Sequence, residues 1–181
     1  MFMKYLYDPE GTANAHDGDG YFMTGDIARR EGGYYFVLGR ASLDIIKSGG
    51  YKISALEIER ELLSLPYIAE AMVVGVPDEE FGQRVAALLS LQEEMTTSFC
   101  REQRGAGKLL NIYKLRRDLR ERLVGYKLPT LLRVVSGELP KTATGKVQKK
   151  ILGPHFFPAS WHECAEIQKW EPNAEGRLPK L

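Results

Sequence analysis

The chain has 181 residues, of which 44% are hydrophobic and 27% are charged, a composition that fits one folded domain with a small appendage. Its formal net charge of +1 gives no general electrostatic reason to expect a nucleic acid or an anionic membrane as a partner. Its apolar runs are too short to span a bilayer, which excludes a membrane-spanning protein as far as the sequence goes.

The first 39 residues predict turns followed by a β-hairpin. Residues 1–20 contain two turn motifs rich in Asp, Gly and Pro. Residues 27–30 and 34–38 are short strand candidates, and Glu31-Gly32-Gly33 between them is a turn signal. A polar joint follows from Gly39 to Gly50.

The next element is a helix with a clear start signal. Ser54-Ala55-Leu56-Glu57 is a capping box, which predicts a helix that continues through Leu65 and ends at Pro66. We expect it to pack through a face made of four residues: Leu56, Glu59, Leu62 and Leu63.

The remaining elements predict a small sheet covered by helices. Three strands are expected at residues 71–76, 85–91 and 131–135. Residues 109–124 predict an amphipathic helix with one apolar stripe: Leu115, Leu119 and Leu123. Residues 93–107 read as a polar surface insertion, and a capping box from Ser160 to Glu163 predicts a short helix in the aromatic tail. The expected fold is α+β: a three-stranded sheet flanked by helices, with the hairpin in front.

Lys146 stands out because it follows Gly145 in a loop of small and hydroxyl residues with other lysines nearby. A flexible ammonium presented in this way can reach a phosphate or a carboxylate. The spacing is not that of a P-loop, because Pro140 and Val147 occupy the positions of its first Gly and its Ser/Thr. Taken alone, the loop could equally be a solvated basic loop.

Two further segments carry polar groups that could hold a ligand. Thr24-Gly25-Asp26 places a carboxylate after a glycine turn, where it suits two adjacent ribose hydroxyls, and Arg40 ends the second hairpin strand. Gly49-Gly50 allows either a close approach to a ligand or a simple hairpin turn, with Lys47 and Lys52 on either side.

Together these segments resemble the last conserved blocks of the AMP-forming acyl-CoA synthetase superfamily. The matching blocks are residues 21–26, Gly39-Arg40 with Asp44-Ile45-Ile46-Lys47 and Gly50-Tyr51-Lys52-Ile53, then Glu57, and finally residues 139–146. The resemblance covers residues 1–152 and is strongest to the acyl-CoA synthetase family member 3 group, which contains malonyl-CoA synthetases.

The resemblance implies roles for the matching residues. Lys146 would be the catalytic lysine of adenylation; Asp26, Arg40 and Thr24 would bind the nucleotide. The hinge of the small C-terminal domain would be Ser42 or Asp44. The joint is one residue longer than in most members of the family, so the resemblance does not decide between the two. Contacts to coenzyme A would come from five residues: Lys47, Gly49, Gly50, Lys52 and Arg120.

The resemblance also implies a division of the chain and a reaction. Residues 1–39 would be a remnant of the large AMP-binding domain, 40–50 the joint, 51–152 the C-terminal domain and 153–181 a tail of unknown role. The reaction would join a carboxylate to coenzyme A with ATP, through an acyl-adenylate, and release AMP and diphosphate. ATP, coenzyme A and Mg²⁺ would serve the complete enzyme. The phosphate loop and the acyl pocket fall outside these residues, so we expect no activity from the chain alone.

Two other functions stay open. The chain could be the end of a peptide-synthetase adenylation domain, although its tail has no carrier-protein attachment motif. It could also be a non-catalytic module that binds a nucleotide or a protein through its exposed hairpin and aromatic tail. Its two cysteines and three histidines are widely spaced, and no secretory or transit signal is visible. We therefore expect no metal site made of side chains, and a cytoplasmic or, for a longer parent, mitochondrial location.

Overall fold

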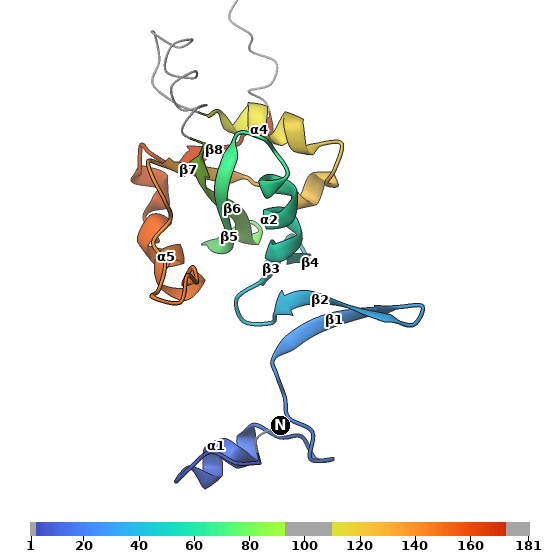
Figure 1. The fold of residues 1–181 in the computed structure, drawn as a ribbon. Coiled ribbons are helices and arrows are strands. Elements are labelled where there is room, and N and C mark those ends of the chain that lie inside the picture. Colours follow the sequence, from blue (N-terminus) through green and yellow to red (C-terminus); the bar gives the residue numbers. More distant parts are fainter. Residues whose placement is uncertain (1–2, 93–109, 173–181) are drawn as a thin grey trace, which may run out of the picture.

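The computed structural model describes residues 3–92 and 110–172 and has the α+β fold predicted from the sequence (Figure 1). The first five elements are α1 (Pro9–Asn14), β1 (Asp26–Glu31), β2 (Tyr34–Arg40), β3 (Ile45–Ser48) and β4 (Tyr51–Ser54). The others are α2 (Ala55–Leu63), β5 (Ile68–Asp78), β6 (Gly82–Leu91), α4 (Ile112–Leu119), a 3₁₀ turn (Gly125–Lys127), β7 (Leu131–Val135), α5 (Lys149–Phe156), a second 3₁₀ turn (Trp161–Glu163) and β8 (Gln168–Lys169). The polar insertion predicted at residues 93–107 lies outside the described residues.

A four-stranded sheet in the order β5-β6-β7-β8 forms the centre of the small domain. β5 and β6 are antiparallel, β6 and β7 are parallel, and β7 and β8 are antiparallel. The three predicted strands are present, and β8 is an addition of two residues. β8 could not be predicted from hydrophobic alternation, because a polar side chain holds it in place. The side chain of Gln168 accepts a hydrogen bond from Ile112 N–H at 3.1 Å and donates one to Leu110 O at 2.7 Å.

Both faces of the sheet are covered, which is why alternate residues of its strands are buried in two separate clusters. Val73, Val85 and Ala87 face α2, α4 and the β3–β4 pair. Met72, Ala86 and Leu88 face the other way, toward α5 and the segment that follows it.

The C-terminal segment is part of the second cluster. Phe157, Trp161 and Ile167 are each at least 92% buried, since their exposed fractions are 4%, 3% and 8%. α5 runs across the boundary predicted at residue 152, so the first part of the tail packs on the sheet. Ser160 begins the second 3₁₀ turn, but its side chain makes no capping hydrogen bond, and the predicted capping box is therefore absent.

Helix α2 begins as predicted but packs through a different face. Ser54 Oγ accepts a hydrogen bond from Glu57 N–H at 3.2 Å, which is the expected N-cap. The side chains that face the sheet are those of Ala55, Ile58 and Leu62. Leu56 and Leu63 are 38% and 51% exposed, so the predicted apolar face was wrong at these two positions.

Helix α4 is shorter than predicted, because Asn111 caps its start at Tyr113 N–H (2.7 Å) and the helix ends at Leu119. The predicted stripe is confirmed, since Leu115, Leu119 and Leu123 are all buried. None of the helices in the described ranges is long and apolar enough to cross a membrane.

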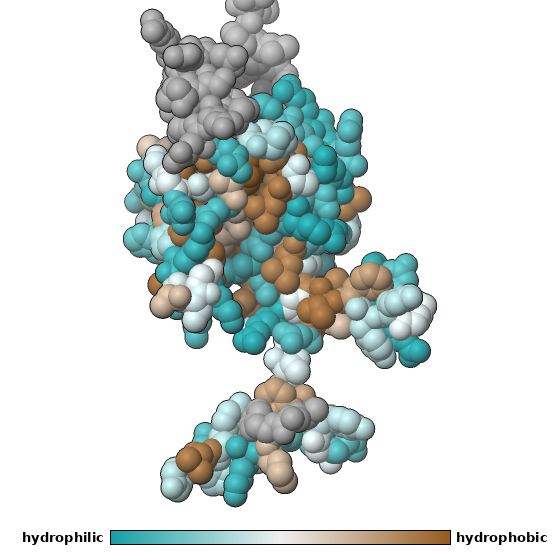
Figure 2. Space-filling model, viewed as in Figure 1, coloured by the Kyte–Doolittle hydropathy of each residue, from teal (hydrophilic) through white to brown (hydrophobic). Residues whose placement is uncertain are grey.

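The β1–β2 hairpin and α1 project away from the small domain (Figure 1). Four consecutive side chains of the hairpin are 46–76% exposed although they are aromatic or apolar: Tyr34, Tyr35, Phe36 and Val37. Figure 2 shows hydrophobic residues, coloured brown, where the hairpin adjoins the small domain, while most of the rest of the hairpin is white to teal. A two-stranded hairpin is marginal alone in water, so these side chains are suited to a surface that covers them.

Adjacent leucines of α2 provide a direct check of its packing face. Leu62→Ala should lower the free energy of unfolding by about 2–5 kcal/mol, because it leaves a cavity in the core. Leu63→Ala should change it by about 0.5 kcal/mol or less, because that side chain is half exposed. Urea unfolding followed by circular dichroism measures both, and equal losses in the two variants would contradict the assigned face.

Candidate functional site

Three predicted nucleotide-binding residues meet where the β1–β2 hairpin opens. Asp26 and Arg40 are register partners, and Arg40 Nε lies 3.6 Å from Asp26 Oδ1. Thr24 Oγ1 accepts a hydrogen bond from Asp26 N–H at 3.1 Å, which fixes the turn before the carboxylate. The side chains of Asp26 and Arg40 are 41% and 66% exposed, so both can reach a ligand. A carboxylate held this way can accept from two neighbouring hydroxyls.

The turn after β2 contains both hinge candidates, in contrasting environments. Leu43 N–H and Asp44 N–H donate to Arg40 O at 3.2 and 2.8 Å. Asp44 is buried, and its Oδ2 accepts a hydrogen bond from Arg40 N–H at 2.9 Å. Ser42 is exposed. The structure therefore separates a fixed residue, Asp44, from a solvent-facing one, Ser42.

Asp44 also belongs to a buried ion triad with Lys149 and Glu59. Lys149 Nζ lies 2.7 Å from Asp44 Oδ1 and 2.8 Å from Glu59 Oε1. All three side chains are 13% exposed. Burial raises the pKa of Glu59, and the charge and hydrogen bond of Lys149 oppose that rise. The triad connects the turn after β2, α2 and the start of α5.

The Lys146 loop is held by its backbone while its ammonium faces solvent. Thr142 N–H donates to Lys146 O at 3.0 Å, and Lys146 N–H donates to Thr142 Oγ1 at 3.1 Å. Gly145 adopts φ +75°, a left-handed conformation that suits glycine and closes the turn. Within residues 3–92 and 110–172, Lys141 and Lys149 have ion-pair partners and Lys146 has none. The loop therefore presents a positive charge on a defined backbone.

Glu70 of β5 anchors the start of this loop. Its Oε2 accepts a hydrogen bond from Leu139 N–H at 2.6 Å, and its Oε1 pairs with Lys141 Nζ. Burial pushes the pKa of Glu70 upward, but the hydrogen bonds from Lys141 and Leu139 and the charge of Lys141 hold it below its ordinary value. The ionised carboxylate is thus the form that the folded chain favours.

Four of the predicted coenzyme A contacts lie on the β3–β4 hairpin. Gly49 and Gly50 form its turn with φ of 55° and 84°, and Lys47 faces Lys52 across the strands. The hairpin is fixed to the β5–β6 end by two hydrogen bonds: Gly49 N–H to Phe81 O at 3.0 Å, and Lys47 N–H to Gln83 Oε1 at 2.7 Å. The glycines thus form a turn, one of the two roles that the sequence leaves open.

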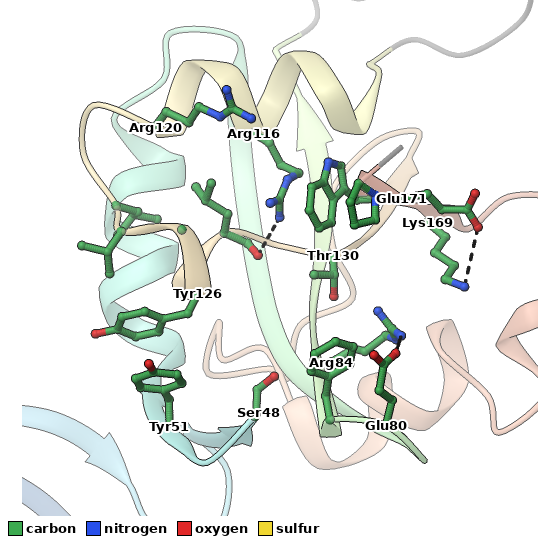
Figure 3. Close-up of a pocket in the computed structure, with 18 residues that line it drawn as sticks. Ser48, Tyr51, Glu80, Arg84, Arg116, Arg120, Tyr126, Thr130, Lys169 and Glu171 are labelled. Atoms are coloured by element: carbon green, nitrogen blue, oxygen red, sulfur yellow. Dashed lines mark hydrogen bonds and ion pairs between the residues drawn. The ribbon is translucent and has the colours of Figure 1, made fainter. Parts of the chain in front are cut away.

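A pocket of about 1110 Å³ lies between this turn and the end of α4 (Figure 3). Two predicted coenzyme A contacts, Gly49 and Arg120, line it. Tyr51 and Tyr126 stack at its edge with ring centroids 4.1 Å apart. Arg116 reaches its wall and donates to Leu128 O and Pro129 O at 3.0 and 2.8 Å. An aromatic edge with arginines nearby suits a ligand with a flat ring and an anionic group.

The site is organised by three residues that were not predicted as site residues from the sequence: Lys149, Glu59 and Glu70. The one available signal was Glu59, an acidic residue placed on the expected apolar face of α2. A carboxylate in such a position needs a buried partner. The partner could not be named from sequence, because Lys149 is 90 residues further along the chain.

Residues 57–146 match the family described as AMP-binding enzyme C-terminal domain. Over 159 residues the chain is 42% identical to a protein named mitochondrial malonate–CoA ligase ACSF3 from Xenopus laevis, covering 87% of this chain and 25% of that protein. It is 41% identical over 196 aligned positions to a CoA ligase of Gibberella moniliformis, covering 100% of this chain and 30% of the relative. The chain thus spans about a quarter to a third of the length of these relatives.

Solved structures also match the chain over most of its length, and the chain again covers less than a third of each of them. ATP-bound MatB from Rhodopseudomonas palustris superposes with a TM-score of 0.69 at 28% identity, over 89% of this chain and 29% of that one. The o-succinylbenzoate CoA synthetase MenE of Bacillus subtilis, in complex with the acyl-adenylate OSB-AMP, superposes with a TM-score of 0.67 at 29% identity, over 93% of this chain and 29% of that one.

The anchor of the Lys146 loop should give a pH-dependent contribution to stability. Because the folded-state pKa of Glu70 is lowered, its stabilisation is present above the unfolded value of about 4.3 and is lost as the pH falls through the folded value. Glu70→Gln should therefore be less stable than the parent chain at neutral pH, and the difference should close at an acidic pH below the folded-state pKa of Glu70.

Urea unfolding at both pH values measures this effect. Glu138→Gln is the matched control, because Glu138 also pairs with Lys141 but its side chain is 84% exposed. A stability gap for Glu70→Gln that stays the same at both pH values would refute the anchoring role.

Proposed function

The chain belongs to the AMP-binding enzyme C-terminal domain family, and from this premise we propose that it is a C-terminal portion of an acyl-CoA synthetase, with residues 51–152 as its mobile domain. The complete reaction would couple a carboxylate to coenzyme A with ATP, through an acyl-adenylate. The observation that carries the proposal is the Lys146 loop, whose backbone is fixed by Thr142 and whose ammonium has no ion-pair partner among the described residues. Phosphoryl chemistry depends on positioning and on charge stabilisation, and such a lysine supplies both.

In the first half-reaction, ATP supplies the activated phosphate and the chain orients it. The Asp26 carboxylate would accept hydrogen bonds from the two ribose hydroxyls, with the guanidinium of Arg40 beside it. The ammonium of Lys146 would lie between the substrate carboxylate and the α-phosphate, where negative charge develops. Both groups are exposed in the chain, which fits a site shared between the large domain, to which Asp26 would belong, and the small domain, which carries Lys146.

Mg²⁺ would enter this reaction with the nucleotide. In the described ranges, no group of three or more His, Cys, Asp or Glu residues could hold a metal ion. We therefore assign the described residues no step that involves the metal.

A rotation of the small domain would let one site serve both half-reactions in turn. We assign the pivot to Ser42, because it is exposed, whereas Asp44 is buried and bonded to Lys149. After rotation, the Gly49-Gly50 turn would line the path of the pantetheine arm. Lys47, Lys52 and Arg120 would contact the phosphates of coenzyme A, which is supported by the pocket beside Gly49 and Arg120.

The rest of the large domain would cover the apolar hairpin, whose side chains from Tyr34 to Val37 are exposed. Malonate is the substrate we favour, because relatives from Xenopus laevis and Arabidopsis thaliana are named malonate–CoA ligases. An intracellular location, mitochondrial or cytoplasmic, is supported by the relatives that are named mitochondrial.

The role of Lys146 can be tested in a chimera. Residues of this chain would replace the matching C-terminal segment of the Xenopus laevis malonate–CoA ligase. Lys146→Ala should slow adenylate formation by about 10²–10³-fold, or about 2.7–4 kcal/mol, while thioester formation from preformed malonyl-adenylate is spared. Diphosphate release and single-turnover thioester assays separate the two steps. Lys150→Ala is the control, and an equal loss in both half-reactions would refute the assignment.

The 181-residue chain alone should give no exchange of labelled diphosphate into ATP with malonate or any simple carboxylate. The reason is that Lys146 and Asp26 lie on exposed surfaces and need a second domain to enclose the nucleotide. The active chimera serves as the positive control in the same assay. Detectable exchange by the chain alone would overturn its assignment as a part of the site.

A further inference from the structure

The ion triad of Asp44, Glu59 and Lys149 lies outside the groups that would touch a substrate, yet it joins three parts of the site. Lys149 is the first residue of α5 and follows Lys146 by three positions. Asp44 is the last residue of the turn after β2, and Glu59 is in α2. The Lys149 ammonium lies within 2.8 Å of both carboxylates.

Burying these three charges costs desolvation free energy, which is offset only when Lys149 lies between the two carboxylates. Each of the three side chains is 13% exposed, so each charge has lost most of its water. A positive charge at the first position of a helix is also opposed by the helix dipole. Without Lys149, two buried carboxylates would face one another with no cation between them. The lysine is therefore held by both carboxylates and screens them from one another, and the triad keeps one negative charge in excess.

Each of the two carboxylates that bind Lys149 also accepts a hydrogen bond from a backbone N–H. Asp44 Oδ2 accepts from Arg40 N–H at 2.9 Å, which closes the turn that contains Ser42. Glu59 Oε1 accepts from Val73 N–H at 2.6 Å, on the outer edge of β5. One ammonium thus ties Asp44, at the end of the turn, and the start of α5 to the same strand.

We propose that Lys149 is a positioning residue that makes Asp44 and the Lys146 loop one rigid body, so that rotation at Ser42 carries the Lys146 ammonium to a defined place. The part of this inference that concerns adenylation rests on the proposed function. The mechanical link between the turn and α5 rests on the contacts of Lys149 alone.

The chain offers matched variants for this test. Lys149→Met keeps the length of the side chain and removes its charge. Lys149→Arg restores a cation that can bind two carboxylates. Lys150→Met is the control, because Lys150 is the next residue of α5 and is exposed.

The link is measured in the 181-residue chain by amide hydrogen exchange in ¹⁵N NMR spectra. Lys149→Met should speed exchange at Arg40 and Val73 by about tenfold or more, with little change at Leu88 in the centre of the sheet. Lys149→Arg should return both rates toward those of the parent, and Lys150→Met should leave them unchanged. Unaltered rates at Arg40 and Val73 in Lys149→Met would overturn the proposal.

If Lys149→Met unfolds the chain, a second variant without any of the three buried charges can be measured instead. Combining Lys149→Met with Asp44→Asn and Glu59→Gln removes all three buried charges at nearly constant size. The amide of Arg40 should still exchange faster than in the parent, because the tie to α5 is gone. Protection equal to that of the parent would overturn the link.

The positioning role is measured in the malonate–CoA ligase chimera. Lys149→Met should lower the rate of adenylate formation by about 10–100-fold and leave thioester formation from malonyl-adenylate within about twofold. Lys149→Arg should recover most of the loss. Equal losses in both steps would indicate a purely structural residue and would overturn the positioning role. An inactive parent chimera would refute the proposed function and the positioning role with it, while the exchange rates would still decide the mechanical link.

Discussion

The buried contact between Lys149 and the carboxylates of Asp44 and Glu59 is the constraint on which the arrangement of the site depends. It brings together a turn, a helix and the start of a second helix that are far apart in the sequence. The geometry is maintained because removing the charge of Lys149 would leave two buried carboxylates without a cation between them. The loop of Lys146 leads directly into this fixed point, which gives its exposed ammonium a defined origin.

Fixed and exposed parts alternate along the chain, and this alternation fits a domain that moves as a unit. The sheet is packed on both faces, and Glu70 attaches the start of the Lys146 loop to it. The residues that we propose to meet ATP, namely Asp26, Arg40 and Lys146, all face solvent. Such groups lose little on changing position, because no buried contact of their side chains has to break.

Local patterns in the sequence predicted the elements well and their contacts less well. The capping box at Ser54 and the strand at residues 131–135 follow from short-range chemistry, and both are present. The predicted packing face of α2 was wrong because the buried face is determined by the residues that contact β5, and not by the positions of the leucines alone. The tie between Asp44 and Lys149 spans 105 positions, a pairing that no local periodicity encodes. The ligand roles came from family resemblance and stay predictions.

The most direct test of the central claim is a crystal structure of the malonate–CoA ligase chimera with a non-hydrolysable malonyl-adenylate analogue. The account predicts Lys146 Nζ within about 3.2 Å of a phosphate or carboxylate oxygen of the analogue, and Asp26 at a similar distance from the ribose hydroxyls. The ion triad should be intact in the same crystal. Lys146 directed into solvent, with another cation at the phosphate, would contradict the account.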